Sequence, residues 1–223
     1  MILKNRLFER IEPSRNAKSI FIFCEGIKRE KQYFQYFQEI DSRISVIIHP
    51  LRHDDDNSPR GLLEIAKNGV LHNDEYKNPK YDFSQETDDE VWIVIDIDED
   101  KRDSRKSQIE EVIGFCKENI NWNIALSNPC FEVWLYYHKS KSKPIFDEEY
   151  PCSHWKNLVN ELIPGGFDSR RHPFLINEAI TNAKNNFAEE KGFPKYACTK
   201  VFELGESIYS LIKGKLQKAL ENL

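Results

Sequence analysis

Carboxylates gather in the segment VWIVIDIDED, residues 91–100, directly after an apolar run. Residues 91–95 are apolar and mostly β-branched or aromatic, which predicts a buried strand. Asp96, Asp98 and Asp100 then follow at every second position. Carboxylates this close repel one another unless a cation lies among them. Mg²⁺ or Mn²⁺ would serve, because hard divalent cations prefer oxygen ligands, and alternate residues such as Asp96 and Asp98 share one face of a strand.

Glu25 stands in a similar position after the apolar segment SIFIFC, residues 19–24. This segment predicts a strand, followed by a turn at Gly26 and a helix over 28–41. If the two strands are neighbours in one parallel sheet, Glu25 lies beside the Asp-x-Asp motif. It would then act as a general acid or base, or as a ligand of a second metal ion.

The elements that must position these residues alternate between strand and helix. Further strands are expected at 44–48 and 122–126, and further helices at 60–72, after a capping box at Ser107, and over 130–138. Ser58-Pro59 and Asn128-Pro129 resemble N-caps followed by proline. Four strand–helix units predict an α/β fold with a mainly parallel four-stranded sheet flanked by helices. Such sheets bind ligands at the carboxyl ends of their strands.

The remainder of the chain is expected to be helical. Apolar residues recur at helical spacing in two stripes, over 174–187 and over 201–216. We therefore predict two parts, a catalytic domain over 1–143 and a helical C-terminal extension over 144–223 that packs on it.

Composition narrows the class of protein. The net charge of −5 argues against a protein that coats nucleic acid by bulk electrostatics. The distribution is uneven, because 82–103 holds ten acidic and two basic residues, whereas 1–31 holds eight basic and four acidic ones. No apolar run approaches the roughly 20 residues of a membrane helix. Five scattered cysteines without a CxxC pair indicate reduced thiols and a cytoplasmic protein.

A strand-end Glu followed about seventy residues later by a strand-end Asp-x-Asp resembles the Toprim domain of topoisomerases, primases and OLD-type nucleases. FIFCEGIKREKQYF, VWIVIDIDED, SNPCFEVWLYYH and FPKYACTKVFELGESI, in that order, resemble the RloB-like family of Toprim proteins, which is related to abortive-infection phage-defence components. One departure is Arg29, where the family has a small hydroxyl residue.

This resemblance implies a Mg²⁺- or Mn²⁺-dependent nuclease that acts on RNA, possibly tRNA, or on DNA. It implies catalytic and metal-binding roles for Glu25, Asp96 and Asp98, a metal ligand at Asp100, and substrate contacts from Lys28, Asn128, Glu132 and Lys200. It also implies a companion ATPase as partner, and it leaves a homo-oligomer open.

Several of these residues also have a possible role that involves neither metal nor substrate. Asp-x-Asp can be a solvated turn, Lys28 a solvated helix residue, Asn128 an N-cap, and Glu132 an acidic residue favoured by the dipole at a helix start. Two alternatives to a nuclease remain. One is a metal-binding adaptor or sensor subunit of a defence ATPase complex. The other is a haloacid-dehalogenase-like phosphatase, which is disfavoured because its Asp-x-Asp follows the first strand of the fold.

Overall fold

A five-stranded sheet forms the centre of the protein in the computed structural model, which describes residues 8–97, 102–146 and 148–221. The strand order is β2-β1-β3-β4-β7. The strands are β1 (Lys18–Cys24), β2 (Ile44–Ile48), β3 (Glu90–Asp96), β4 (Trp122–Asn128) and β7 (Cys198–Thr199). Strands β1 to β4 are parallel, and β7 pairs antiparallel with β4.

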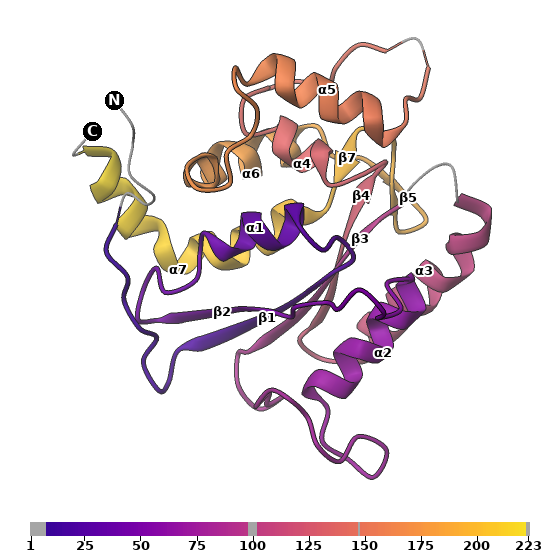
Figure 1. Cartoon of the computed structure of the whole chain (residues 1–223), viewed down its shortest axis with the longest axis vertical. Helices are drawn as coiled ribbons and strands as arrows, with labels where there is room; N and C mark the ends of the chain where they lie inside the picture. Colours follow the sequence, from indigo (N-terminus) through magenta and orange to yellow (C-terminus); the bar gives the residue numbers. More distant parts are fainter. Residues whose placement is uncertain (1–7, 98–101, 147, 222–223) are drawn as a thin grey trace.

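Helices cover both faces of this sheet (Figure 1). Helices α2 (Pro59–Val70) and α3 (Arg102–Glu118) lie on one face. Helices α1 (Arg29–Gln35), α4 (Glu132–Tyr136) and α7 (Val201–Glu221) lie on the other side, and α5 (Cys152–Leu162) and α6 (Ile176–Asn185) pack against α4. A 3-10 helix, His172–Leu175, precedes α6, and a separate hairpin joins β5 (Glu189–Glu190) to β6 (Phe193–Pro194).

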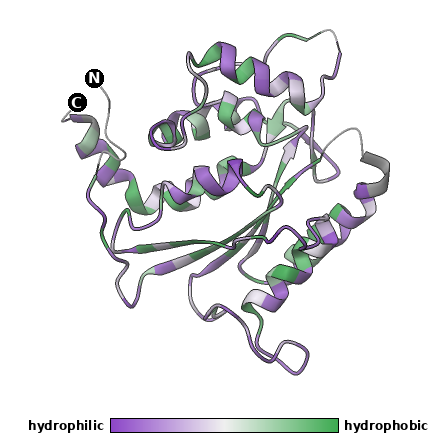
Figure 2. Ribbon diagram, in the orientation of Figure 1, coloured by the Kyte–Doolittle hydropathy of each residue, from purple (hydrophilic) through white to green (hydrophobic). Residues whose placement is uncertain are grey.

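The alternation of side chains along the strands divides the core into two layers. In β1, Ile20 and Ile22 face the α1 and α7 side, whereas Phe21 and Phe23 face α2 and α3. Because both faces are covered, β1 and β3 each contain an unbroken apolar run, which is typical of buried parallel sheets. Figure 2 shows these apolar strands between helices whose outer faces are hydrophilic.

The predicted α/β class and the four parallel strands are confirmed, each strand within two residues of its expected bounds. Ser58 caps α2 as predicted, since its hydroxyl oxygen accepts a hydrogen bond from the Gly61 amide at 3.1 Å. Strand β7 is an addition, contributed by a segment expected to be helical.

The largest differences from the predictions are at two helix boundaries. Helix α1 ends at Gln35 instead of residue 41, because the chain continues as turns and adopts a positive φ of 55° at Glu39. Helix α3 begins at Arg102, so Ser107 lies inside it and does not start it. The Ser-x-x-Glu pattern at Ser107 therefore does not mark the start of this helix, which begins more than a turn earlier, at Arg102.

The C-terminal helices share a core with the sheet. Both expected stripes are buried, in α6 through Ile176 and Ile180 and in α7 through Leu204 and Ile208. These residues join the same apolar cluster as Ile20 of β1. The division at residue 143 stays a prediction. Across the described part of the chain, every helix is too short or too polar to cross a membrane.

Candidate active site at the carboxyl edge of the sheet

Glu25 and Asp96 meet where β1 and β3 end. The Glu25 amide donates to the Val94 carbonyl at 3.1 Å, which continues the β1–β3 ladder one residue beyond β1. The Asp96 amide in turn donates to Glu25 Oε2 at 3.3 Å. The structure therefore brings the two candidate residues together at the edge where parallel sheets bind ligands.

Arg105 of α3 lies against this pair. Its Nη1 donates to Glu25 Oε1 at 2.8 Å and its Nη2 to Glu25 Oε2 at 2.6 Å, which is the two-pronged pairing that a guanidinium makes with a carboxylate. Nη2 also lies 3.2 Å from the Asp96 carbonyl oxygen. Only 10 % of the Arg105 side chain is exposed. Sequence reasoning missed Arg105, which is a positive partner for these carboxylates.

Glu30 adds a third carboxylate from the first turn of α1. It is buried, and its carboxyl group packs directly on Gly26, where an added Cβ atom would stand 1.9 Å from Glu30 Oε2. Gly26 therefore makes space for Glu30. Its φ is not positive, so the turn itself does not require glycine. The spacing Glu-Gly followed by a second Glu was a signal for this contact.

Glu132, at the start of α4, is the fourth carboxylate, with 4 % of its surface exposed. Arg29 Nε lies 3.8 Å from Glu132 Oε1. Arg29, the position that departs from the family pattern, thus contributes a charge that partly balances the site.

The carboxylates alter one another's protonation. Burial raises the pKa of Asp96 well above its usual value, and the charges of Glu30, Glu25 and Glu132 add to the effect. Burial also raises the pKa of Glu30 to about 7, with Glu132 and Glu25 contributing. Four carboxyl groups face two arginines here, and a bound cation would favour their ionised forms and lower these pKa values.

The donor chemistry of the site fits a hard divalent cation, because every candidate ligand is a carboxylate oxygen. Within residues 8–97, 102–146 and 148–221, no three His, Cys, Asp or Glu side chains are arranged to hold a metal ion. Asp98 and Asp100 lie outside the described residues. The metal site therefore stays a prediction. Of its predicted ligands, the structure describes only Asp96 and Glu25.

Thiolate chemistry is disfavoured at this edge. Cys24, the last residue of β1, is buried, and burial raises its pKa well above the usual value, with Glu30 and Asp96 adding to the rise. A nucleophilic cysteine needs the opposite, a thiolate favoured by positive surroundings. All five cysteines are free.

Asn128 does not cap a helix, so that prediction was wrong. It ends β4 instead, is 1 % exposed, and its Nδ2 donates to the Pro194 carbonyl at 3.0 Å. Helix α4 begins later, with Phe131 at the N-cap position and no side-chain cap. Asn128 therefore fastens the β5–β6 hairpin to β4.

The two predicted substrate lysines differ in their surroundings. Lys28 is exposed just before α1, close in sequence to Glu30. Lys200 is mostly buried and pairs with Glu189 at 2.6 Å between Nζ and Oε2, so its charge is already partly used. Of the two lysines, the exposed Lys28 is the more accessible to a phosphate group.

The fold and the site together define an α/β protein whose parallel sheet carries an acidic carboxyl edge, consistent with a Toprim-like fold. The chain belongs to the RloB-like protein family, whose model matches residues 20–208. Comparisons with curated proteins and with solved structures find no match.

Proposed function

We propose that this protein is a metal-dependent nuclease that cleaves phosphodiester bonds of RNA, such as tRNA, or of DNA. The observation that carries the proposal is the meeting of Glu25 and Asp96 at the carboxyl edge of the sheet, with the Asp96 amide 3.3 Å from Glu25 Oε2. The excess of carboxylates at this edge supports a site that is completed by a cation.

Asp96 would hold Mg²⁺ or Mn²⁺, together with Asp98 and Asp100 and with Glu25 as a possible further ligand. The bound ion would polarise a phosphoryl oxygen and ease the ionisation of a water molecule.

The chain's own residues would perform the remaining tasks. Glu25 accepts or returns a proton, and the Arg105 fork fixes the orientation of its carboxylate. The Arg105 guanidinium also adds positive charge beside the place where a phosphodiester gains negative charge. Lys28, exposed before α1, binds a neighbouring phosphate.

One observation favours a second candidate, a metal-binding adaptor of a defence ATPase complex. Both oxygens of Glu25 are already bound to Arg105, as in an ion pair whose role is structural. The resemblance to phage-defence components supports a companion ATPase in either case. The two candidates differ in whether purified protein cuts nucleic acid.

The test is incubation of purified protein with total tRNA, plasmid DNA and single-stranded DNA, in Mg²⁺, in Mn²⁺ and in EDTA. We expect cleavage of at least one substrate with metal, none with EDTA, and none by Asp96→Asn. Thermal melting gives an independent readout, because Mn²⁺ bound only to the folded state raises the melting temperature. A Mn²⁺-induced rise without cleavage would favour the adaptor, and the same rise in Asp96→Asn would exclude Asp96 as a ligand.

A further inference from the structure

A cavity of about 360 Å³ lies between α3 and the β5–β6 hairpin. This volume falls within the range of about 300–1,000 Å³ that small-molecule sites occupy. Its apolar part is formed by Ile97, Ile109, Phe193 and Pro194. Its charged rim is formed by Lys106, Lys191, Lys195, Glu110 and Glu190.

The cavity adjoins the candidate active site. Ile97, in its wall, directly follows Asp96, and its amide donates to the Ser127 carbonyl at 2.9 Å. Lys106, at its rim, directly follows Arg105, the partner of Glu25. The cavity therefore lies beside the carboxyl edge of the sheet, on the side of α3.

Phe193 gives the cavity an aromatic wall. Its side chain is only partly buried, and its ring stacks on no other ring within the described residues. The wall is firmly held, because the carbonyl of the neighbouring Pro194 accepts the hydrogen bond from buried Asn128. A fixed, partly exposed aromatic ring is the platform on which unpaired nucleobases stack.

Lys191 occupies an unusual position at the rim. It and Gly192 form the two-residue turn of the hairpin, with φ values of 53° and 87°. Two positive φ values are the pattern of a type I′ turn, where Asn or Gly at the first position costs less than lysine. The turn presents an exposed ammonium group at the rim despite this conformational cost.

The other rim lysines are also accessible. Lys106 and Lys195 are exposed, and Lys195 Nζ lies 4.0 Å from Glu190 Oε2, at the limit of an ion pair. Exposed pairs of this kind contribute little and exchange readily for a stronger partner. A phosphate group offers such a partner.

We propose that this cavity is a nucleotide subsite that takes one unpaired base of a single-stranded nucleic acid against Phe193, with adjoining phosphates on Lys106 and Lys191. This inference rests on the proposed nuclease function and adds the class of substrate. A base inside a duplex is stacked and paired and has no access to such a pocket unless it is flipped out. Single strands or unpaired loops combine free bases with a polyanionic backbone.

The test measures fluorescence anisotropy of labelled 12-nucleotide single-stranded RNA, single-stranded DNA and a 12-base-pair duplex, all in EDTA to prevent cleavage. We expect Phe193→Ala and Phe193→Leu to weaken single-strand binding about 5- to 150-fold, the range for loss of one base–aromatic stack. Phe193→Leu keeps the apolar filling, so it separates stacking from folding. Melting temperatures check both variants.

The lysines are tested with matched variants. Lys191→Asn removes the charge and keeps a residue that suits the turn, because asparagine tolerates positive φ. Lys106→Ala is compared with Lys117→Ala, an exposed lysine at the far end of the same helix α3. We expect weaker binding and a smaller salt dependence for Lys191→Asn and Lys106→Ala, and no change for Lys117→Ala.

Three results would overturn the proposal: wild-type protein that binds no single strand, equal binding by Phe193→Leu and wild type, or equal effects of the variants on duplex. The experiments distinguish failure of the subsite from failure of the proposed nuclease function. Metal-dependent cleavage that is insensitive to Phe193→Leu removes the subsite alone. Phe193-dependent single-strand binding without any cleavage removes the nuclease and leaves the subsite.

Discussion

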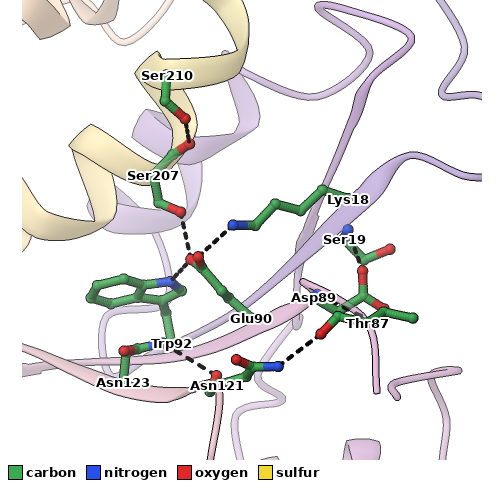
Figure 3. A network of polar contacts seen from close by, with 10 residues as sticks. All are labelled: Lys18, Ser19, Thr87, Asp89, Glu90, Trp92, Asn121, Asn123, Ser207 and Ser210. Carbon is green, nitrogen blue, oxygen red and sulfur yellow. Dashed lines mark hydrogen bonds and ion pairs between the residues drawn. The ribbon is translucent and has the colours of Figure 1, made fainter. Parts of the chain in front are cut away.

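Strand β3 begins at Glu90 and ends at Asp96, and these two carboxylates have opposite surroundings. Glu90 is fully engaged (Figure 3): Lys18 Nζ lies 2.5 Å from its Oε1, and Trp92 Nε1 and Ser207 Oγ donate to its Oε2 at 2.7 and 2.5 Å. Asp96 instead lies among Glu25, Glu30 and Glu132, whose charges raise its pKa.

The difference separates a structural end of the sheet from the end that we propose is functional. At the amino end, Glu90 is paired with Lys18, and Ser207 links α7 to the sheet through Glu90. At the carboxyl end, four described carboxyl groups, two of which are buried, face two arginines. This arrangement costs stability and is characteristic of sites that bind or react. Within the acidic segment 82–103, Glu90 and Asp96 therefore lie at opposite ends of a seven-residue strand, roughly 20 Å apart.

Substitution at the carboxyl end should give the largest effect. Glu25→Gln keeps the size of the side chain and one acceptor for Arg105, but it removes the group that transfers a proton. We expect the cleavage rate to fall about a hundred- to ten-thousand-fold, the usual contribution of general acid–base catalysis. Single-turnover cleavage with metal measures the fall, and the melting temperature should change little. Full activity of Glu25→Gln would contradict the role of Glu25.

Substitution at the amino end should act on stability and leave the chemistry alone. Glu90→Ala leaves Lys18 and the Trp92 indole without their acceptor in a mostly buried place. We expect a loss of roughly 2–4 kcal/mol in the free energy of unfolding. Urea denaturation measures it. Ser207→Ala, which removes one donor to Glu90, is the milder control, with a loss of about 1 kcal/mol. The folded Glu90→Ala fraction should cleave at the wild-type rate.

The two ends of the sheet should also differ in how the free energy of unfolding depends on pH. We expect this effect to be about as large as that of Glu90→Ala, or smaller. The pKa of Glu30 rises from 4.5 to about 7 in the folded state. The stabilisation that protonated Glu30 gives to the folded state is therefore fully present below about pH 4.5 and is lost as the pH rises through about 7. The shift corresponds to roughly 3 kcal/mol.

Urea denaturation in EDTA from pH 4.5 to 8 measures this loss, and Glu30→Gln should reduce its slope. The slope that remains is expected from Asp96, whose pKa is also raised. Glu90→Gln, at the other end of the sheet, is the matched control and should keep the slope. An unchanged slope in Glu30→Gln would show that another group carries it.

The strand pattern was readable from the sequence because it is local. Apolar runs with turn residues between them predicted the four parallel strands, and the parallel order placed Glu25 and Asp96 at one edge. Arg105 was not readable, because the Ser107 capping box placed the start of the helix after Arg105, so that Arg105 fell in a loop. Its pairing with Glu25 spans 80 residues, and no local pattern specifies it.

Asn128 shows the same limit. An asparagine before proline is compatible with a helix cap and with a strand end. Asn128 ends a strand, and its side chain bonds to Pro194, 66 residues later in the chain. Glu132 and Glu30 were visible as acidic residues near helix starts. Only the packed structure reveals that both point into one charged site, as the shared influence on the pKa of Asp96 shows.

The pairing of β4 with β7 has a consequence for synthesis of the chain. Ser127 and Asn128 acquire their β7 partners only when Thr199 and Cys198 have been made, about 70 residues later. At translation speeds of about 5–20 residues per second, the edge of β4 stays open for roughly 4–14 s. During that interval Asn128 also lacks Pro194, which holds the hairpin in place. A nascent chain therefore closes the β4 edge of its sheet only after residue 199 has been made.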